Sequence, residues 1–337
     1  YWLGCVKAAV QFVLIWLFPR MWRRGSKESY LHLIQIYERL FHFYYYLGNP
    51  LKAVYFTLQM LRVSLLKEAA TCRRLSFSAM FGHALQVFGM GSLSSYVIRQ
   101  SLEGINAQSD VSSQAKILLW GGVHKFLMGK TDESAVLFKQ SLEFGRRIGD
   151  QRTVDEVSFN YGLQKFMLNQ YECAKLWAQK IRTSTEKRSN WQGELWGLCL
   201  EIACEVRLEK LSRSSLLSLL SRLADHLRFS NRAIPSDTLL GKSVLALGWL
   251  KAGEREQAVG CCLTVRAMLR DYNPVSIHTS WALMTLSGVV RRLQEGEGEG
   301  ESKRELQELQ ESIELVLKRS LRSFHILTMR REAVEKC

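Results

Sequence analysis

Histidine and cysteine side chains are the first candidates for chemistry in this chain. Its 337 residues include 7 histidines and 8 cysteines. The cysteines form no C-x-x-C pair, and no histidine stands at a metal-ligand spacing from other ligands. Cys261 and Cys262 are adjacent and therefore point about 100° apart on a helix, which favours core packing over a redox or metal site. We expect no metal and no cofactor, and we interpret the cysteines as buried free thiols of a cytoplasmic protein.

Phosphate chemistry is the second candidate, and its sequence signature is missing. The chain has no G-x-x-x-x-G-K-[ST] loop and no pair of metal-binding aspartates in a strand context. A Gly-x-Gly pattern occurs within 296–300, but it lies in a Gly-Glu run whose carboxylates would repel phosphate. We therefore expect no catalytic residue within this chain.

Polar and aromatic side chains at one-turn spacing form the candidate site. They stand on two predicted neighbouring helices and are Gln35, Glu38, His42, Tyr45, His83 and Gln86. One interpretation is a groove for a protein or peptide partner, or for a sister domain, with the two histidines adjacent. The other is that the histidines are partly solvated face residues. The matching positions of the middle repeats are apolar and read either as the continuing groove or as ordinary core: Leu119, Val123, Phe126, Phe159, Leu163 and Phe166.

A periodic pattern of small residues predicts the elements that position these side chains. A leading residue is followed twelve positions later by a small one, and the pairs recur roughly every 41 positions. The leading members are Phe41, the one large exception, and Gly82, Gly122, Gly162, Ala203 and Ala246; their partners are Ala53, Ser94, Ser134, Ala174, Ser215 and Ala258. Turn residues stand between them at Gly48, Gly89, Gly129, Asn169, Lys210 and Gly253. Each unit is predicted to be a helical hairpin that stacks on the next one.

The fold expected from this pattern is all-α, a tetratricopeptide-like α-solenoid with about seven helical hairpins over 28–294. Gly288 follows Ala246 at nearly the same interval that separates the earlier leading members, so a seventh first helix fits 275–294. Its turn is expanded into a Gly/Glu-rich linker over 295–303, and an amphipathic helix is predicted over 304–337. GKTDESAVLFKQSLEFGRRIGD and YGLQKFMLNQYECAKLWAQKI resemble tetratricopeptide repeats, although the period is longer than the usual one of that family, which is about 34 residues.

Residues 1–19 are a separate segment with two interpretations. Residues 1–18, YWLGCVKAAVQFVLIWLF, are nearly all apolar, and Pro19 and four cations follow. They are either a membrane span with a basic cytoplasmic end or the second helix of a preceding repeat. We favour the repeat helix, because Lys7 and Gln11 share one stripe and the run is short for a span. The chain starts at Tyr1, so we expect it to be part of a larger protein.

The net charge of +14 is spread over many helices. The densest basic groups interleave with apolar residues, which is typical of amphipathic helices rather than of aromatic-studded nucleic-acid platforms. We expect no nucleic-acid partner.

Four segments resemble the C-terminal helical-repeat region of large proteins that carry a class III adenylate or guanylate cyclase domain and an AAA-type NTPase domain, a layout like that of soluble adenylyl cyclase. They are YERLFHFYYYLGNPLKAVYFTLQMLRVS, GELWGLCLEIACEVRLEKL, LGWLKAGEREQAV and LKRSLRSFHIL. The resemblance implies a regulatory or scaffolding tail in the cytoplasm. The alternative function is a membrane-anchored adaptor in which residues 1–18 span the bilayer and the repeats recruit cytosolic partners.

Overall fold

All regular structure in the described part of the chain is α-helical. The computed structural model describes residues 27–66, 71–106, 110–229, 234–274, 276–295 and 301–326, with Lys7 and Thr328. These residues form 14 helices and no strand. The all-α solenoid predicted from the sequence is therefore confirmed, and its helices fall into two compact units, 1–154 and 155–337, a division that the repeat pattern does not mark.

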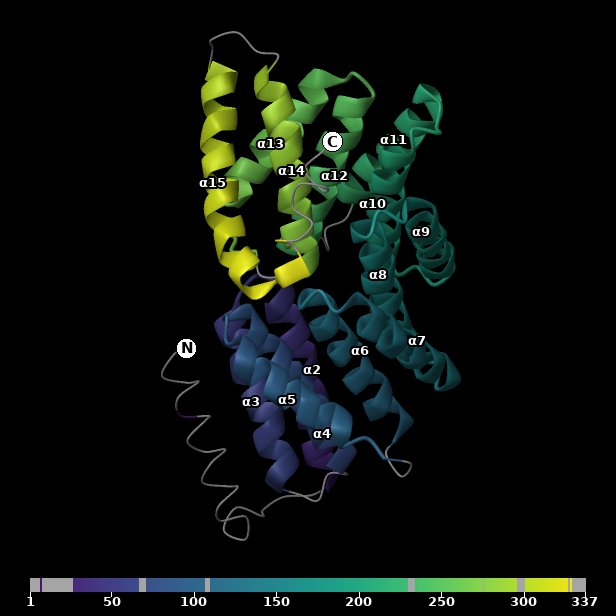
Figure 1. The fold of residues 1–337 in the computed structure, drawn as a ribbon, viewed down its shortest axis with the longest axis vertical. Coiled ribbons are helices and arrows are strands. Elements are labelled where there is room, and N and C mark those ends of the chain that lie inside the picture. Colours follow the sequence, from purple (N-terminus) through teal and green to yellow (C-terminus); the bar gives the residue numbers. More distant parts are fainter. Residues whose placement is uncertain are drawn as a thin grey trace. The chain divides into compact units, whose positions relative to one another are not determined.

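Unit 1 is a stack of three helical hairpins (Figure 1). Each hairpin joins two antiparallel helices, and α4 contacts both α3 and α6. The helices are α2 Lys27–Tyr46, α3 Pro50–Leu66, α4 Thr71–Val87, α5 Gly91–Glu103, α6 Val111–Leu127 and α7 Thr131–Arg147. The next helix, α8 Gln151–Met167, begins in unit 1 and continues in unit 2.

Unit 2 continues the same plan. In it α10 contacts α9 and α12, and α12 contacts α13 and α14. After α8 its helices are α9 Tyr171–Glu186, α10 Trp191–Leu208, α11 Arg213–Phe229, α12 Pro235–Lys251, α13 Arg255–Met268, α14 Ile277–Glu295 and α15 Glu301–Ser323. The amphipathic α15 buries Leu306, Leu309, Ile313 and Leu317 against α13 and α14.

Left-handed residues end the first helix of most hairpins, as the turn pattern predicts. Gly48, Gly89, Gly129, Asn169 and Gly253 all have positive φ, between 60° and 82°. After Gly129 the chain closes the helix, because the backbone N–H of Lys130 donates to the carbonyl of Lys125 at 2.9 Å. This bond satisfies a carbonyl at the end of the helix and sets the reversal of the chain.

Small residues bring the helices of a hairpin into close contact. In the third hairpin the Ser134 hydroxyl on α7 donates to the carbonyl of Gly122 on α6 at 2.8 Å. A Cβ at Gly122 would lie 2.7 Å from the Phe138 ring, so only glycine fits without a shift. The expected pair, Gly122 and Ser134, is thus a direct contact point between the two helices.

The fifth hairpin departs from the predicted pattern. Its left-handed residue is Glu209, with φ 54°, rather than the predicted Lys210, and α11 begins only at Arg213. The longer turn shifts the register of α11, so that Leu216 is buried while the predicted partner Ser215 is exposed. A leucine here keeps two helix backbones further apart than a serine or an alanine does.

Both ends of the chain carry predictions that are only partly covered. The predicted helix of residues 1–19 lies outside the described residues except for Lys7, and so does most of the linker over 295–303. The C-terminal helix begins at Glu301, ahead of its predicted start at 304, and ends at Ser323, after which Phe324 and Ile326 are buried. Among the described helices, none combines the length and the apolar character needed to cross a membrane.

Candidate functional site

Three of the six predicted site residues lie in a buried aromatic cluster of unit 1. The His83 Nε2 atom lies 2.9 Å from the Tyr45 hydroxyl oxygen, which joins α4 to α2. Trp120 from α6 packs against both histidines, with ring centroids 4.8 Å from His83 and 6.2 Å from His42. Burial, followed by the charges of Arg152 and Lys116, holds the pKa of His42 well below its usual value. The His42 side chain is therefore neutral near pH 7, as packing in an aromatic cluster requires.

Gln86 belongs to a second buried contact between repeats. Its carbonyl oxygen accepts from the Ser94 hydroxyl at 3.1 Å, and its amide lies 3.4 Å from the Met128 sulfur. The Ser94 hydroxyl also lies 3.3 Å from His124 Nδ1. Burial, followed by the charges of Lys125 and Lys130, lowers the pKa of His124 to about 4. These polar groups tie α4, α5 and α6 together.

Gln35 and Glu38 are the members of the predicted set that reach solvent. Gln35 is exposed, and Glu38 is half-buried in an ion pair with Lys116 of α6. The apolar set of the middle repeats is buried throughout, as core residues are. The structure thus brings His42, Tyr45 and His83 together in a buried cluster inside the unit. A partner-binding role for the six residues stays a prediction.

An open cleft in unit 2 offers exposed chemistry that sequence reasoning missed. It has a volume of about 690 Å³ and lies between the start of α10 and one face of α11. Its lining residues are Trp191, Glu194, Ser218, Ser221, Arg222, Asp225 and His226. We call it the α10–α11 cleft.

The walls of the α10–α11 cleft are held by reciprocal contacts. The Trp191 and His226 rings stack in parallel, with centroids 5.0 Å apart and 5° between their planes. The Trp191 indole N–H donates to the His226 carbonyl at 3.2 Å, and His226 Nε2 lies 3.0 Å from the Trp191 carbonyl oxygen. Arg222 donates to Glu194 at 2.7 Å and to Glu186 at 3.1 Å. Aromatic stacking and charged hydrogen bonds therefore join the two walls of the cleft.

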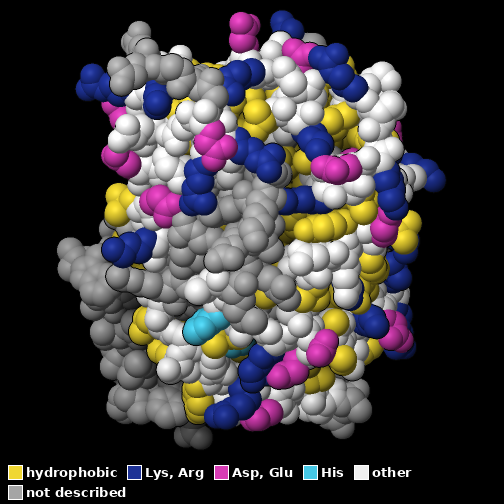
Figure 2. Space-filling view, turned by 45° about the horizontal axis from the view of Figure 1, so that its top comes forward, with side chains coloured by type: hydrophobic (Ala, Val, Ile, Leu, Met, Phe, Trp, Pro, Cys, Tyr) yellow, Lys and Arg dark blue, Asp and Glu magenta, His cyan; other side chains and the backbone are white. Residues whose placement is uncertain are grey.

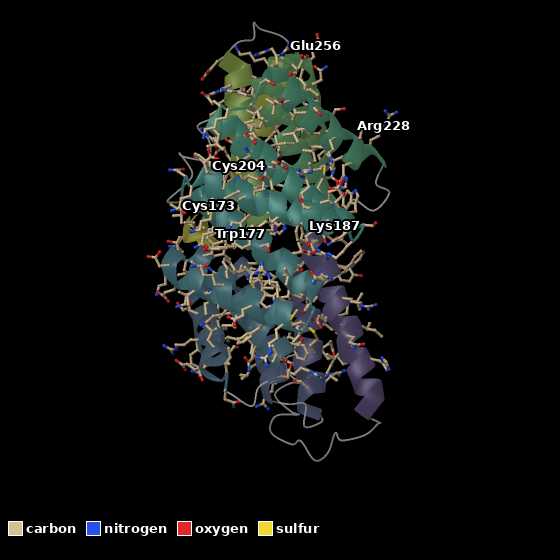
Figure 3. The ribbon with its side chains drawn as sticks, turned by 90° about the vertical axis from the view of Figure 1, so that its right-hand side faces the viewer. Cys173, Trp177, Lys187, Cys204, Arg228 and Glu256 are labelled. Carbon is tan, nitrogen blue, oxygen red and sulfur yellow. The ribbon has the colours of Figure 1, made fainter. Side chains whose placement is uncertain are left out.

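Three polar side chains of the cleft have no internal partner. Within the described ranges, no hydrogen bond or ion pair engages the Asp225 carboxylate or the hydroxyls of Ser218 and Ser221. All three are exposed on α11. Arg228, one turn further along α11, projects away from the ribbon (Figure 3). The cleft thus presents one carboxylate and two hydroxyls to an incoming group.

The loss of the small-residue contact explains why the cleft forms between α10 and α11. α11 packs instead against glycines of α12, where a Cβ at Gly241 would lie 2.7 Å from the Leu227 side chain. Two sequence signals mark the site in retrospect. The fifth turn is the one where the predicted position holds a lysine rather than a glycine or an asparagine, and α11 carries the serine-rich stretch SRSSLLSLLSR.

A second polar group of unit 2 is fully buried. Asp237, near the start of α12, accepts from the Trp196 indole at 3.0 Å and from the Gln192 amide at 2.9 Å. Burial raises the pKa of Asp237 to about 7, although these two hydrogen bonds lower it. Burial also lowers the pKa of His278, whose ring lies 6.0 Å from that of Trp196, to about 3. This buried interior links α10, α12 and α14.

Four of the five described cysteines of unit 2 are buried free thiols, as expected, whereas Cys173 is a free thiol that is only half-buried. Burial raises the pKa of Cys199, Cys204, Cys261 and Cys262, so the thiolate is disfavoured at each. Cys204, labelled in Figure 3, is fully buried. Over the residues that the structure covers, no group of three or more His, Cys, Asp or Glu side chains is arranged to hold a metal ion.

Charges of both signs alternate on the face drawn in Figure 2, where Lys and Arg side chains stand among Asp and Glu side chains.

Comparison with known proteins assigns no family: no family model matches the chain, and no curated protein matches its sequence.

Proposed function

We propose that this chain is a non-catalytic helical-repeat module that binds a peptide segment of a partner protein in the α10–α11 cleft. The observation that carries the proposal is the cleft itself: it is open, internal contacts join its walls, and it presents unpartnered polar groups beside a tryptophan. Rigid aromatic side chains and fixed polar groups are what recurring peptide-recognition sites use. Stacked repeats supply the rigid support that such a site needs.

We propose further that the binding is regulatory and that the chain serves a larger nucleotide cyclase or signalling NTPase. This step rests on the resemblance of its repeat segments to the C-terminal repeat regions of such proteins. Sequencing the transcript upstream of the Tyr1 codon tests it directly. A reading frame that encodes a cyclase or NTPase domain is expected, and a frame without either domain would contradict the assignment.

Selection from a random peptide library tests the binding function without a known partner. The purified chain is immobilised and compared with two variants on α11, Ser221→Lys in the cleft and Ser214→Lys outside it. Both add one positive charge at an exposed serine of the same helix. We expect peptides that are enriched on the wild type and on Ser214→Lys and are lost on Ser221→Lys. If no peptide binds in a way that depends on Ser221, the cleft is not a peptide site and the proposal is wrong.

A further inference from the structure

We infer that the α10–α11 cleft recognises a basic peptide, with an arginine or lysine side chain seated between Trp191 and the Asp225 carboxylate. This inference rests on the proposed function and specifies the chemistry of the partner. Its basis is the charge of the cleft, the unpartnered carboxylate and the aromatic wall.

The cleft is acidic in a chain that is otherwise basic. Among the lining residues, Glu194 and Asp225 carry two negative charges and Arg222 carries one positive charge, whereas the whole chain carries +14. A basic peptide is repelled by the chain as a whole and attracted at this place. Charge complementarity of this kind selects the site and the partner more than it adds raw affinity.

The unpartnered groups of the cleft are acceptors for a cation. Asp225 has no internal ion pair in the described structure, and the hydroxyls of Ser218 and Ser221 lie on the same face of α11 as that carboxylate. An ammonium or a guanidinium has only donors, so a carboxylate and two hydroxyls together satisfy it. The Trp191 ring stacks on His226 with one face and forms a wall of the cleft, and tryptophan is the best aromatic partner for a cation.

An acidic or phosphorylated peptide fits the cleft poorly. Its natural partner would be Arg222, but two carboxylates of the chain already hold that guanidinium, at 2.7 Å and 3.1 Å. An incoming anion would have to displace them and would also meet Asp225. The same arrangement leaves Asp225 as the group that an incoming cation can pair with.

A pair of synthetic peptides tests the inference. The probe is a fluorescein-labelled nonapeptide in which four arginines alternate with serines, and its control has citrulline in place of each arginine, which removes the charge and keeps the shape. Binding to the full chain is measured by fluorescence anisotropy at 150 mM salt. We expect the arginine peptide to bind at least roughly ten-fold more tightly than the citrulline peptide, because only the charged guanidinium can form charge-assisted hydrogen bonds with the carboxylates of the cleft.

Matched variants locate the effect. Asp225→Asn is expected to weaken binding of the arginine peptide by roughly three-fold to five-fold, while Asp271→Asn, the same change at an exposed aspartate outside the cleft, leaves it within about two-fold. Ser221→Lys should abolish binding and Ser214→Lys should not. Far-UV circular dichroism of each variant checks its folding. Because the Asp225 and Ser221 changes are made in separate variants, one of them still tests the inference if the other does not fold.

The outcomes separate this inference from the proposed function. Equal binding of the arginine and citrulline peptides, or no effect of Asp225→Asn on a folded variant, overturns the inference. Library peptides that are neutral or acidic and still depend on Ser221 would overturn it too, while the peptide-binding function would stand.

Discussion

Asp237 makes the stability of unit 2 depend on pH in a direction opposite to that of most carboxylates. Its pKa rises from 3.8 in the unfolded chain to about 7 in the folded one, because burial disfavours the charged form. The folded state therefore binds the proton more tightly than the unfolded state between pH 4 and pH 7. The free energy of unfolding that this group supplies is fully present at low pH and is lost as the pH rises through that window. The loss is on the order of 4 kcal/mol, from a shift of about three pKa units at 1.36 kcal/mol each.

The change that removes this dependence is Asp237→Asn. The asparagine oxygen can still accept from the Trp196 indole, and the Gln192 amide can turn so that its oxygen faces the new amide group. We expect the free energy of unfolding of the variant relative to the wild type to increase by about 4 kcal/mol between pH 4 and pH 8. The fully buried Asp237 lies near Gln192, Trp196 and Cys199, none of which carries a charge at these pH values.

Histidines with a lowered pKa work in the opposite direction and must be separated from Asp237. His42, His124 and His278 stay neutral in the folded state, so their contribution is lost as the pH falls below the usual histidine value. The wild type and the variant contain the same histidines. Their contribution therefore cancels when the free energies of unfolding of the two proteins are subtracted.

Urea unfolding at pH 4, 5, 6, 7 and 8, followed by far-UV circular dichroism, measures the difference. The exposed Asp271→Asn variant serves as the control, and its free energy of unfolding should differ from that of the wild type by the same amount at every pH. If the difference between Asp237→Asn and the wild type is also independent of pH, the carboxyl does not hold its proton in the folded state, and the reasoning from burial is refuted.

Two further predictions concern packing, beside the cleft variants Ser221→Lys and Asp225→Asn described above. Gly122→Ala should be less stable than Gly91→Ala by about 1–3 kcal/mol in urea unfolding, because a Cβ at Gly122 meets the Phe138 ring while a Cβ at Gly91 meets nothing within 4 Å; equal stability would contradict the close contact of α6 and α7. Glu201→Ala should lower the stability by about 2 kcal/mol, because it removes a buried carboxylate that accepts from Arg182 at 2.8 Å and from Gln179 at 3.1 Å. Glu172→Ala, which breaks an exposed pair with Lys210, should leave the thermal unfolding midpoint unchanged, and a similar loss in both variants would show that burial of Glu201 does not matter.

The sequence predicts the helices well because their signals are local. A left-handed residue must close each first helix, and glycine or asparagine there is readable at Gly48, Gly129 and Asn169. The position of the fifth turn is not predicted correctly, because its left-handed residue, Glu209 with φ 54°, is neither a glycine nor an asparagine. No local sequence pattern marks Glu209 as a left-handed residue.

The sequence does not predict the burial of the candidate site residues, for a different reason. The one-turn spacing of His42 and Tyr45 correctly places them on one face of α2. Trp120 of α6 covers His42, and His83 of α4 covers Tyr45, and both of these covering residues are distant from α2 in the sequence. A periodic pattern shows which residues share a face, but only the three-dimensional stack shows whether the next repeat leaves that face open.

The α10–α11 cleft follows from the one hairpin that breaks the small-residue rule. With Leu216 where other second helices have a small residue, α11 cannot approach α10 closely along its length, and contact with α10 is exchanged for contact with α12. The glycines Gly241 and Gly248 on α12 accept Leu227 and Leu220 of α11, so the apolar face of α11 stays buried although it has left its own partner. The opposite face of α11, with its serines and Asp225, is then free to line an opening. A binding site can therefore arise in a solenoid without an inserted loop, when the packing of one second helix shifts from its own repeat to the next.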